Sequence, residues 1–276
     1  MGKYLTPDSH RFPCRLVVSD LDGTLLNSDY HLTPGVRRAI NGLQKRTIPL
    51  VIASGREWPA VQMYYHDLEL HTLYIGANGG FIYFPEENRV LHQVLLPGDT
   101  ADFLLRELKS FQLAVFCCDL SRVYMAGDKR ELQTFISDRR FDSVLCQDLT
   151  REGPSQLQKI TLRGSKTELD RFKLRLTSST DGVEMVFSGE TCLEIIPEGV
   201  NKGAGVEIVA DYLGVSLDDI VAVGDAMNDL PMLFRVGTSV AMGNAAAEVK
   251  AAAHYCAPSN DEDGAAMVFC ACERKP

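Results

Sequence analysis

The stretch RLVVSDLDGTLL, residues 15–26, decides the fold that this chain adopts. Its apolar run is typical of a buried strand and leads directly into Asp20 and Asp22. Residues two apart on an extended chain point to the same side, so both carboxylates lie on one side of the strand end. At roughly 4 Å and an effective dielectric near 20, two such charges repel by about 4 kcal/mol. We therefore expect a positively charged group at this point.

Similar apolar runs alternate with helical patterns in the first and last thirds of the chain. The expected strands are RLVVS, IPLVIAS and LYIG, followed later by IVAVG, TSVAM and YCA. Helices are expected from Thr33-Pro34, around Pro59, after Gly203, after Asn228 and through residues 245–253. Strands that alternate with helices predict an α/β fold with a doubly wound parallel sheet.

The middle of the chain has a different pattern. Its strand-like segments alternate between apolar and polar residues, which is typical of an antiparallel sheet. Helical patterns interrupt them at residues 102–110, 129–139 and 166–178. We interpret residues 86–190 as an α+β domain that is inserted between two halves, 1–85 and 191–276, of one α/β domain.

Composition excludes several classes of partner. The chain has 276 residues and a formal net charge of -9, whereas broad binding to nucleic acid or to an anionic membrane needs a basic surface. No stretch approaches the roughly 18 consecutive apolar residues of a membrane span. We therefore expect neither a nucleic acid nor a membrane as partner. Composition leaves the oligomeric state open.

Cysteine usage indicates a reducing compartment. The eight cysteines include no C-x-x-C pair, and several lie in apolar runs, as reduced buried thiols do. A cytoplasmic location is the prediction that follows. The N-terminus lacks the apolar core of a signal peptide, although Gly2 with Thr6 fits the short and common myristoylation pattern.

Polar residues follow the ends of the expected parallel strands, where ligands bind in open α/β sheets. They lie in Asp20-Leu21-Asp22, Ser54-Gly55-Arg56, Asn201-Lys202-Gly203, Gly224-Asp225 and Asn228-Asp229. Carboxylates, a hydroxyl, glycine amides and one lysine would thus meet at a single edge of the sheet. Each of these signals is weak alone, and the set is specific.

A divalent cation answers the charge problem of the first strand. Mg²⁺ prefers oxygen ligands and takes one or two carboxylates together with phosphate oxygens. Asp20, Asp225 and a backbone carbonyl of residues 20–22 could hold it, with Asp229 orienting a metal-bound water or Lys202. Ser54, Gly55 and Lys202 beside such a metal would form a phosphate cradle. One aspartate of the first pair would remain for proton transfer.

At these positions the chain resembles a known family. DLDGTLL, SGR, NKG and GDAMNDLPML are similar, in that order, to the four motifs of the haloacid dehalogenase (HAD) superfamily. The last third, with VAMGNAAAEVK and NDEDGAAMVF, resembles the Cof-type phosphatases with a type IIB cap. The resemblance implies a Rossmann-like core, an inserted cap domain and a cytosolic Mg²⁺-dependent phosphohydrolase that acts on small phosphorylated metabolites, often sugar phosphates.

The resemblance also implies roles for individual residues. Asp20 would be the nucleophile that forms an aspartyl-phosphate, and Asp22 would be the general acid and then the general base. Mg²⁺ would be held by Asp20, the carbonyl of Asp22 and Asp225. Asp229 would contact these groups without binding the metal itself. The phosphoryl oxygens would be bound by the Leu21 amide, Ser54, Gly55, Lys202 and Asn228. The sequence departs from the family at Arg56, which Glu57-Trp58 separates from the expected proline.

Structural roles compete with these catalytic ones. Asp22 could cap a turn, Ser54 could cap a helix, and Asn228-Asp229 could cap the helix that follows. Lys202 taken alone would be an ordinary solvated residue at a helix start. The NGG at residues 78–80 is interpreted as a type I′ hairpin turn with no part in the chemistry. The six histidines lack metal-binding spacing and are taken as surface or core residues.

Three alternative functions compete with a phosphatase. A sugar phosphomutase would use the same residues but pass the phosphoryl group to a sugar hydroxyl. A phosphometabolite sensor would keep the fold without catalysis, although every catalytic residue type is present. A dehalogenase would need neither Asp22 nor a metal. Substrate choice is expected to depend on the inserted domain, which one sequence does not resolve further.

Overall fold

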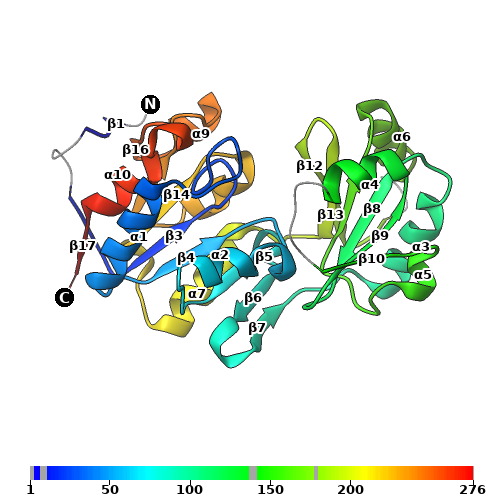
Figure 1. Ribbon diagram of the computed structural model, residues 1–276, viewed down its shortest axis with the longest axis horizontal. Helices are drawn as coiled ribbons and strands as arrows, with labels where there is room; N and C mark the ends of the chain where they lie inside the picture. The colour runs from blue at the N-terminus through cyan, green and yellow to red at the C-terminus, as the bar shows by residue number, and fades with distance from the viewer. Residues whose placement is uncertain (1–2, 7–10, 137–141, 177–179, 276) are drawn as a thin grey trace. The chain divides into compact units, whose positions relative to one another are not determined.

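The computed structural model describes residues 3–6, 11–136, 142–176 and 180–275. Its backbone divides into two compact units (Figure 1). Unit 1 consists of residues 1–55, 64–92 and 201–276, and unit 2 consists of residues 56–63 and 93–200. The Gly2 pattern and the ends of the predicted helices at 137–139 and 177–178 lie outside the described residues.

A nine-stranded sheet forms the centre of unit 1, with the strand order β1-β16-β15-β14-β3-β4-β5-β6-β7. Pairing is parallel from β1 to β5 and antiparallel between β5 and β6. The strands are β1 (Lys3–Tyr4), β3 (Leu16–Ser19), β4 (Leu50–Ala53), β5 (Tyr74–Gly76), β6 (Phe81–Phe84), β7 (Arg89–Gln93), β14 (Ile220–Gly224), β15 (Thr238–Ala241) and β16 (Tyr255–Cys256). The predicted parallel α/β sheet is confirmed.

The helix predicted from Thr33-Pro34 begins as expected, whereas the helix predicted around Pro59 is divided into two pieces. Thr33 accepts the backbone N–H of Val36 and caps α1 (Pro34–Lys45), which carries proline in its first turn. Pro59 lies in a 3₁₀ turn, Trp58–Ala60, and the separate helix α2 (Gln62–Asp67) follows it. The remaining helices are α7 (Lys202–Leu213), α8 (Leu230–Leu233), α9 (Ala247–Ala252) and α10 (Gly264–Ala271).

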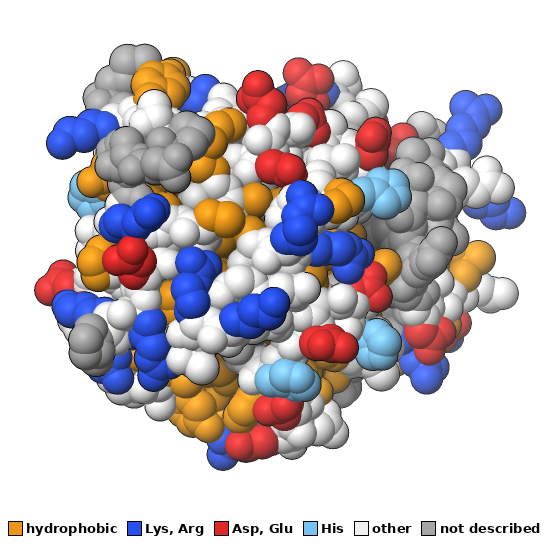
Figure 2. Space-filling view, turned by 60° about the vertical axis from the view of Figure 1, so that its left-hand side comes forward, with side chains coloured by type: hydrophobic (Ala, Val, Ile, Leu, Met, Phe, Trp, Pro, Cys, Tyr) orange, Lys and Arg blue, Asp and Glu red, His pale blue; other side chains and the backbone are white. Residues whose placement is uncertain are grey.

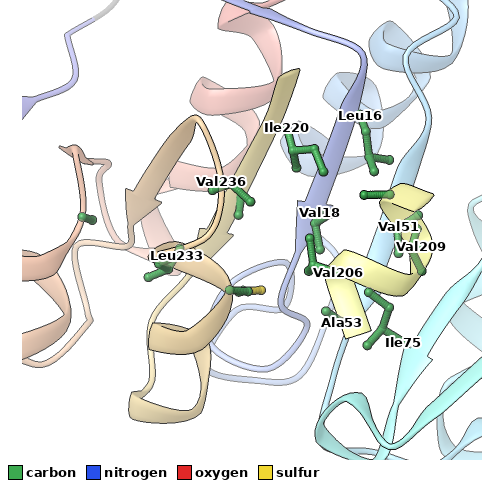
Figure 3. Packing of buried hydrophobic residues seen from close by; sticks show 14 of the residues in the cluster. Leu16, Val18, Val51, Ala53, Ile75, Val206, Val209, Ile220, Leu233 and Val236 are labelled. Atoms are coloured by element: carbon green, nitrogen blue, oxygen red, sulfur yellow. The ribbon is translucent and has the colours of Figure 1, made fainter. Parts of the chain in front are cut away.

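One face of the sheet packs on α7 and α8 (Figure 3). Alternate residues of the central strands, such as Leu16 and Val18, belong to the same buried cluster as Val206 and Val209 of α7. None of the buried residues of α1 belongs to this cluster, as expected when helices cover both faces of a doubly wound sheet. Burial of each side chain of this size stabilises the fold by about 1.5–3 kcal/mol, because apolar surface is removed from water.

Unit 2 is built on a six-stranded sheet with the order β10-β9-β8-β11-β13-β12. Pairing is antiparallel except between β9 and β10. The strands are β8 (Ala114–Cys118), β9 (Val123–Gly127), β10 (Ser143–Leu145), β11 (Ile160–Arg163), β12 (Val183–Gly189) and β13 (Cys192–Pro197). The helices are α3 (Gly98–Leu108), α4 (Lys129–Ile136), α5 (Leu149–Glu152) and α6 (Lys166–Leu176). This region therefore has the predicted α+β composition.

Two strands belong to a different sheet from the one that the predicted domain boundaries, at residues 85/86 and 190/191, assign to them. Strand β13 follows residue 190, yet it pairs with β11 and β12 inside the six-stranded sheet. Strand β7 follows residue 85, yet it lies at the end of the nine-stranded sheet. A short apolar strand fits either sheet by pattern alone, so strand pairing and not composition decides its place.

Two strands near the chain ends and helix α10 were not expected from the sequence. Strand β2 (Phe12–Cys14) pairs in parallel with β17 (Cys272–Arg274), and α10 packs against α1.

On the face shown in Figure 2, basic and acidic side chains are interspersed with hydrophobic ones. Among the described residues, no helix combines the length and apolar character needed to cross a membrane.

Candidate functional site

The topology of unit 1 brings the predicted site residues to one edge of the sheet. Strand β3 lies between β14 and β4, so the residues after these three strands are neighbours. Asp20, Ser54 and Asp225 follow directly after their strands. Lys202 is the first residue of α7, which begins where Asn201 accepts the backbone N–H of Ala204 at 3.0 Å.

Lys202 is the positively charged group that the first strand requires. Its Nζ lies 2.5 Å from Oδ1 of Asp20 and 2.6 Å from Oδ1 of Asp229, and only 1% of the residue is exposed. Burial alone would lower the pKa of Lys202, but the two carboxylates overcome this effect and raise it. The lysine therefore carries a fixed positive charge between two acids, and the reading of Lys202 as an ordinary solvated residue is wrong.

Asp20 is buried and asymmetrically bonded. Burial raises the pKa of Asp20 well above its usual value, the Lys202 ammonium opposes this effect, and the charges of Asp229 and Asp225 reinforce it. Oδ1 accepts from Lys202, whereas Oδ2 is buried and has no hydrogen-bond partner among the described residues. A buried carboxylate oxygen without a partner costs about 1–3 kcal/mol, so this atom is suited to bind a ligand.

Asp225 lies across from Asp20 and is held by two side chains. Thr24 Oγ1 donates to Oδ1 at 3.0 Å, and Asn244 Nδ2 donates to Oδ2 at 3.2 Å. Burial, followed by the charge of Asp229, raises the pKa of Asp225 to about 6. A Cβ on Gly23, whose φ is +77°, would lie 2.5 Å from Oδ2 of Asp225. Only glycine leaves room for this carboxylate.

Asp229 is fully buried, and both of its carboxylate oxygens accept hydrogen bonds from neighbouring groups. Its Oδ2 accepts the backbone N–H groups of Asp225 and Ala226, both at 2.9 Å, while its Oδ1 accepts from Lys202. The contacts to the backbone are those of a turn cap, and the contact to Lys202 is the one that the sequence predicts. The Asp229 side chain therefore caps the turn that ends at Asp229 and not the following helix α8, where it makes no capping bond.

The hairpin between β5 and β6 contributes a residue that the sequence analysis left out of the chemistry. The hairpin itself is confirmed, with Asn78 and Gly79 at φ values of 57° and 102°. Asn78 is buried, and its Oδ1 accepts from Asn228 Nδ2 at 3.0 Å. A Cβ on Gly55 would lie 3.0 Å from the same oxygen. Asn78 thus bonds to Asn228 and lies close to Gly55, two of the residues predicted to bind the phosphoryl oxygens.

A signal for Asn78 was present in the sequence. The residue is the second after β5, which lies beside β4 in the sheet, so its loop begins at the same edge as Ser54. Ser54 is buried, its N–H donates to the Ile75 carbonyl, and its own carbonyl accepts from the Asn78 N–H. Because NGG is a typical turn sequence, it was interpreted only as a turn, although its asparagine lies shortly after a strand end.

The remaining predicted residues occupy the loop after β3. Leu21 is buried, and its carbonyl accepts the N–H groups of Leu25 and Leu26. Asp22 is half-buried, and its backbone forms a short bridge with Leu26. The roles predicted for the Leu21 amide and for Asp22 remain predictions.

The donor set fits a hard divalent cation. One oxygen from each of Asp20, Asp225 and Asp229 lies within 4.8 Å of the others. The oxygens of Asp229 already accept from Lys202 and from backbone N–H groups, which leaves Asp20 and Asp225 as the available carboxylates. The partnerless Oδ2 of Asp20 is the observation that favours a cation here, since carboxylate oxygens are the ligands that Mg²⁺ prefers.

Comparison with known proteins gives the class of this enzyme. A family model described as haloacid dehalogenase-like hydrolase matches residues 17–269. The chain belongs to this family. A curated HMP-PP phosphatase of Escherichia coli K12 is 32% identical over 240 residues, which cover 86% of this chain and 87% of the relative. The protein is therefore an enzyme, a hydrolase of the HAD phosphatase type.

Solved structures agree with this assignment. A haloacid dehalogenase-like hydrolase from Bacteroides thetaiotaomicron superposes with a TM-score of 0.88 at 27% identity, covering 93% of this chain and 98% of that one. A sugar phosphatase of HAD subclass IIB superposes with a TM-score of 0.78 at 20% identity, covering 92% and 97%, which shows the fold alone. The resemblance to Cof-type phosphatases with a Rossmann-like core, predicted from the motifs, is confirmed.

Proposed function

We propose that this protein is a Mg²⁺-dependent phosphomonoester hydrolase that acts on small phosphorylated metabolites through an aspartyl-phosphate on Asp20. The observation that carries the proposal is the state of the Asp20 carboxylate. One of its oxygens is fixed by a buried lysine, and the other is buried with no hydrogen-bond partner in the described part of the chain. Such a carboxylate is preorganised for a cation and a phosphoryl group.

In this mechanism Asp20 attacks phosphorus, and the bond from phosphorus to the leaving oxygen breaks. Asp22 donates its proton to that oxygen, so the product leaves as a neutral alcohol. Asp22, now ionised, then takes a proton from water, and the water oxygen attacks phosphorus. The bond between phosphorus and Asp20 breaks, which releases inorganic phosphate and restores both carboxyl groups.

Mg²⁺ would be held by Asp20, the carbonyl of Asp22 and Asp225. When bound, it neutralises negative charge between the carboxylates and the phosphoryl group. Lys202 contributes a second positive charge, which its two buried ion pairs hold in position. Asp229 keeps that lysine and the loop of Asp225 in place.

The phosphoryl oxygens would be bound by donors from several loops. These are the amide of Leu21, the hydroxyl of Ser54, the amide of Gly55, Lys202 and the side chain of Asn228. Asn78 orients the last of these, because its Oδ1 accepts one N–H of the Asn228 amide. Donors that are fixed before the substrate arrives need no reorganisation during the reaction.

We infer that unit 2 acts as the cap that selects the substrate and that the substrate is a sugar phosphate or a similar small phosphate ester. The curated relative named for HMP-PP supports a small phosphorylated substrate, and the subclass IIB fold supports a cap. All eight cysteines are free, which supports a reducing cytoplasm as the place of action.

The test is phosphate release from p-nitrophenyl phosphate and from a panel of sugar phosphates, nucleotides and cofactor phosphates. We expect turnover that requires Mg²⁺, disappears with EDTA and falls at least 1,000-fold in Asp20→Asn. Unchanged turnover after chelation, or in Asp20→Asn, would contradict the proposal. Phosphate release without a bisphosphate activator distinguishes a hydrolase from a mutase, and a lack of turnover across the whole panel indicates a sensor.

A further inference from the structure

Asn244 makes two contacts that join separate parts of the proposed metal site. It lies in the loop after β15, the strand beside β14, and its loop therefore begins at the same sheet edge as Asp225. Its Nδ2 donates to the carbonyl oxygen of Gly23 at 2.8 Å and to Oδ2 of Asp225 at 3.2 Å. One amide group thus connects the loop after β3 with the loop after β14.

The orientation of the Asn244 amide is fixed by the chemistry of its partners. The backbone N–H of Asn260 donates to Oδ1 of Asn244 at 3.0 Å, and a backbone N–H can only donate. A carbonyl oxygen such as that of Gly23 can only accept, so the NH₂ group must face Gly23 and Asp225. The flipped amide would lose these bonds and place its oxygen against a carboxylate.

The same chain of amides continues away from the site. Asn260 is buried, and its Nδ2 donates to the carbonyl of Leu26 at 2.9 Å. Asn244 and Asn260 together therefore hold both ends of the segment from Gly23 to Leu26. This segment directly follows Asp22, whose carbonyl is the proposed backbone ligand.

We propose that Asn244 is a positioning residue that sets the separation between Asp225 and the Asp22 carbonyl for the cation. The inference rests on the proposed function, because it assigns a role toward the metal of that site. Thr24 donates to the other oxygen of Asp225, so each carboxylate oxygen accepts one neutral donor and keeps a free lone pair. Asn244 fixes the plane of the carboxylate without adding charge.

The expected loss of Mg²⁺ affinity without Asn244 is taken from other metal sites, where loss of a group that orients a ligand costs about 10–100-fold in metal affinity. Asn244 is exposed, so its truncation leaves no buried cavity and should change the stability of the metal-free protein little. A defect in metal affinity without a defect in folding is therefore the expected signature of this residue.

The experiment compares Mg²⁺ binding to the full chain and to Asn244→Ala by calorimetry, without substrate. We expect the dissociation constant to rise about 10–100-fold, while the melting temperature without Mg²⁺ stays within about 2 °C. The Mg²⁺ concentration for half-maximal phosphatase activity should rise by the same factor, with kcat at saturating Mg²⁺ changed less than about threefold. The matched control is Asn41→Ala, an exposed asparagine on α1, which should bind Mg²⁺ as the wild type does.

Two results would overturn the inference. One is an Asn244→Ala protein that is folded and binds Mg²⁺ with unchanged affinity. The other is an equal loss of affinity in Asn41→Ala. If Asn244→Ala melts early, Asn244→Ser, which keeps a small polar side chain, replaces it in the same measurements. Failure of the wild type to bind Mg²⁺ would instead contradict the proposed function, so the two failures are distinguishable.

Discussion

Lys202 holds the acidic site together, because it is a buried cation between two carboxylates. Replacing it by methionine keeps most of the side-chain volume but leaves Asp20 and Asp229 buried without their partner. Breaking a buried ion pair in this way costs about 3–5 kcal/mol. We expect Lys202→Met to lose at least about 100-fold in kcat and to be destabilised by a similar 3–5 kcal/mol at pH 7.5.

The pH dependence of this variant has a defined sign. Burial already raises the pKa of Asp20, and loss of the ammonium raises it further. A carboxyl group whose pKa is raised by folding destabilises the protein when it is ionised, so stability recovers as the pH falls. Urea unfolding of both proteins should show a smaller difference at pH 5 than at pH 7.5. A difference that is constant or larger at pH 5 would contradict this account.

Asn78 allows a test that separates its side chain from its backbone. Its φ of 57° lies in the left-handed region, where glycine is free of strain. Asn78→Gly therefore removes the contact to Asn228 while leaving the turn intact. We expect kcat/KM to fall about 10-fold, which corresponds to the loss of one hydrogen bond in the site. Steady-state kinetics on p-nitrophenyl phosphate measures this effect.

A matched control for Asn78 exists in the same unit. Asn88 also has a positive φ, 47°, and its Oδ1 accepts from the hydroxyl group of Tyr83. It is exposed and lies outside the site, so Asn88→Gly should keep wild-type kinetics. Equal kinetics in both variants would show that the contact between Asn78 and Asn228 has no role in catalysis.

Asp225 makes metal binding sensitive to pH. Without metal, burial and the charge of Asp229 raise the pKa of Asp225 to about 6. A cation must displace the proton, so its affinity is highest above this pKa and falls as the pH decreases below it. We expect Mg²⁺ affinity measured by calorimetry to be about 10-fold weaker at pH 5 than at pH 7.5. An affinity that is the same at both pH values would refute this prediction.

At the scale of elements, the hairpin loop after β5 lies against the start of α7. A Cβ on Gly79, whose φ is +102°, would lie 2.1 Å from the carbonyl oxygen of Asn201. Gly79→Ala must therefore displace the hairpin or the helix start, and we expect it to cost more than about 2 kcal/mol in urea unfolding. A Cβ on Gly214, at φ +63°, would meet no described atom within 4 Å beyond its chain neighbours and its own helix backbone, so Gly214→Ala should cost only about 1 kcal/mol of backbone strain. Equal costs would show that the close approach is unimportant.

Local signals in the sequence predicted many elements of the core. The apolar run before Asp20 forms a fully buried strand, and Thr33-Pro34 begins a helix. The elements that were missed or misplaced depend on distant partners. Strand β13 could have joined either sheet, and α10 is apolar nearly all round, so its packing against α1 leaves no helical periodicity to detect.

The residues of the candidate site also fall into two groups, those that local sequence signals predict and those whose role depends on distant partners. Asp20, Lys202 and Asp225 follow strand ends or begin a helix, and their positions could be inferred because parallel strands share one edge. Asn78 and Asn244 also lie near strand ends, but their contribution depends on individual hydrogen bonds. An asparagine in a turn has an ordinary structural explanation, so sequence alone gives no reason to prefer a role in the site.

At the scale of the whole molecule, thiol reactivity tests how the chain is packed. Seven of the eight cysteines are buried, and Cys270 is exposed. We expect Ellman's reagent to modify about one thiol in the native protein and all eight after denaturation. Cys270→Ser should abolish the fast reaction. Rapid modification of several thiols in that variant would show that the interior is more open than this packing allows.

The strand order of the large sheet also has a consequence for biosynthesis. Strand β3 pairs with β4, which follows it closely, and with β14, which begins at Ile220. A ribosome that adds about 5–20 residues per second needs roughly 10–40 s to translate the intervening chain. During this interval the nascent polypeptide exposes an apolar strand edge that is prone to aggregation. Protection of this edge by chaperones should therefore matter most until β14 has been translated and can pair with β3.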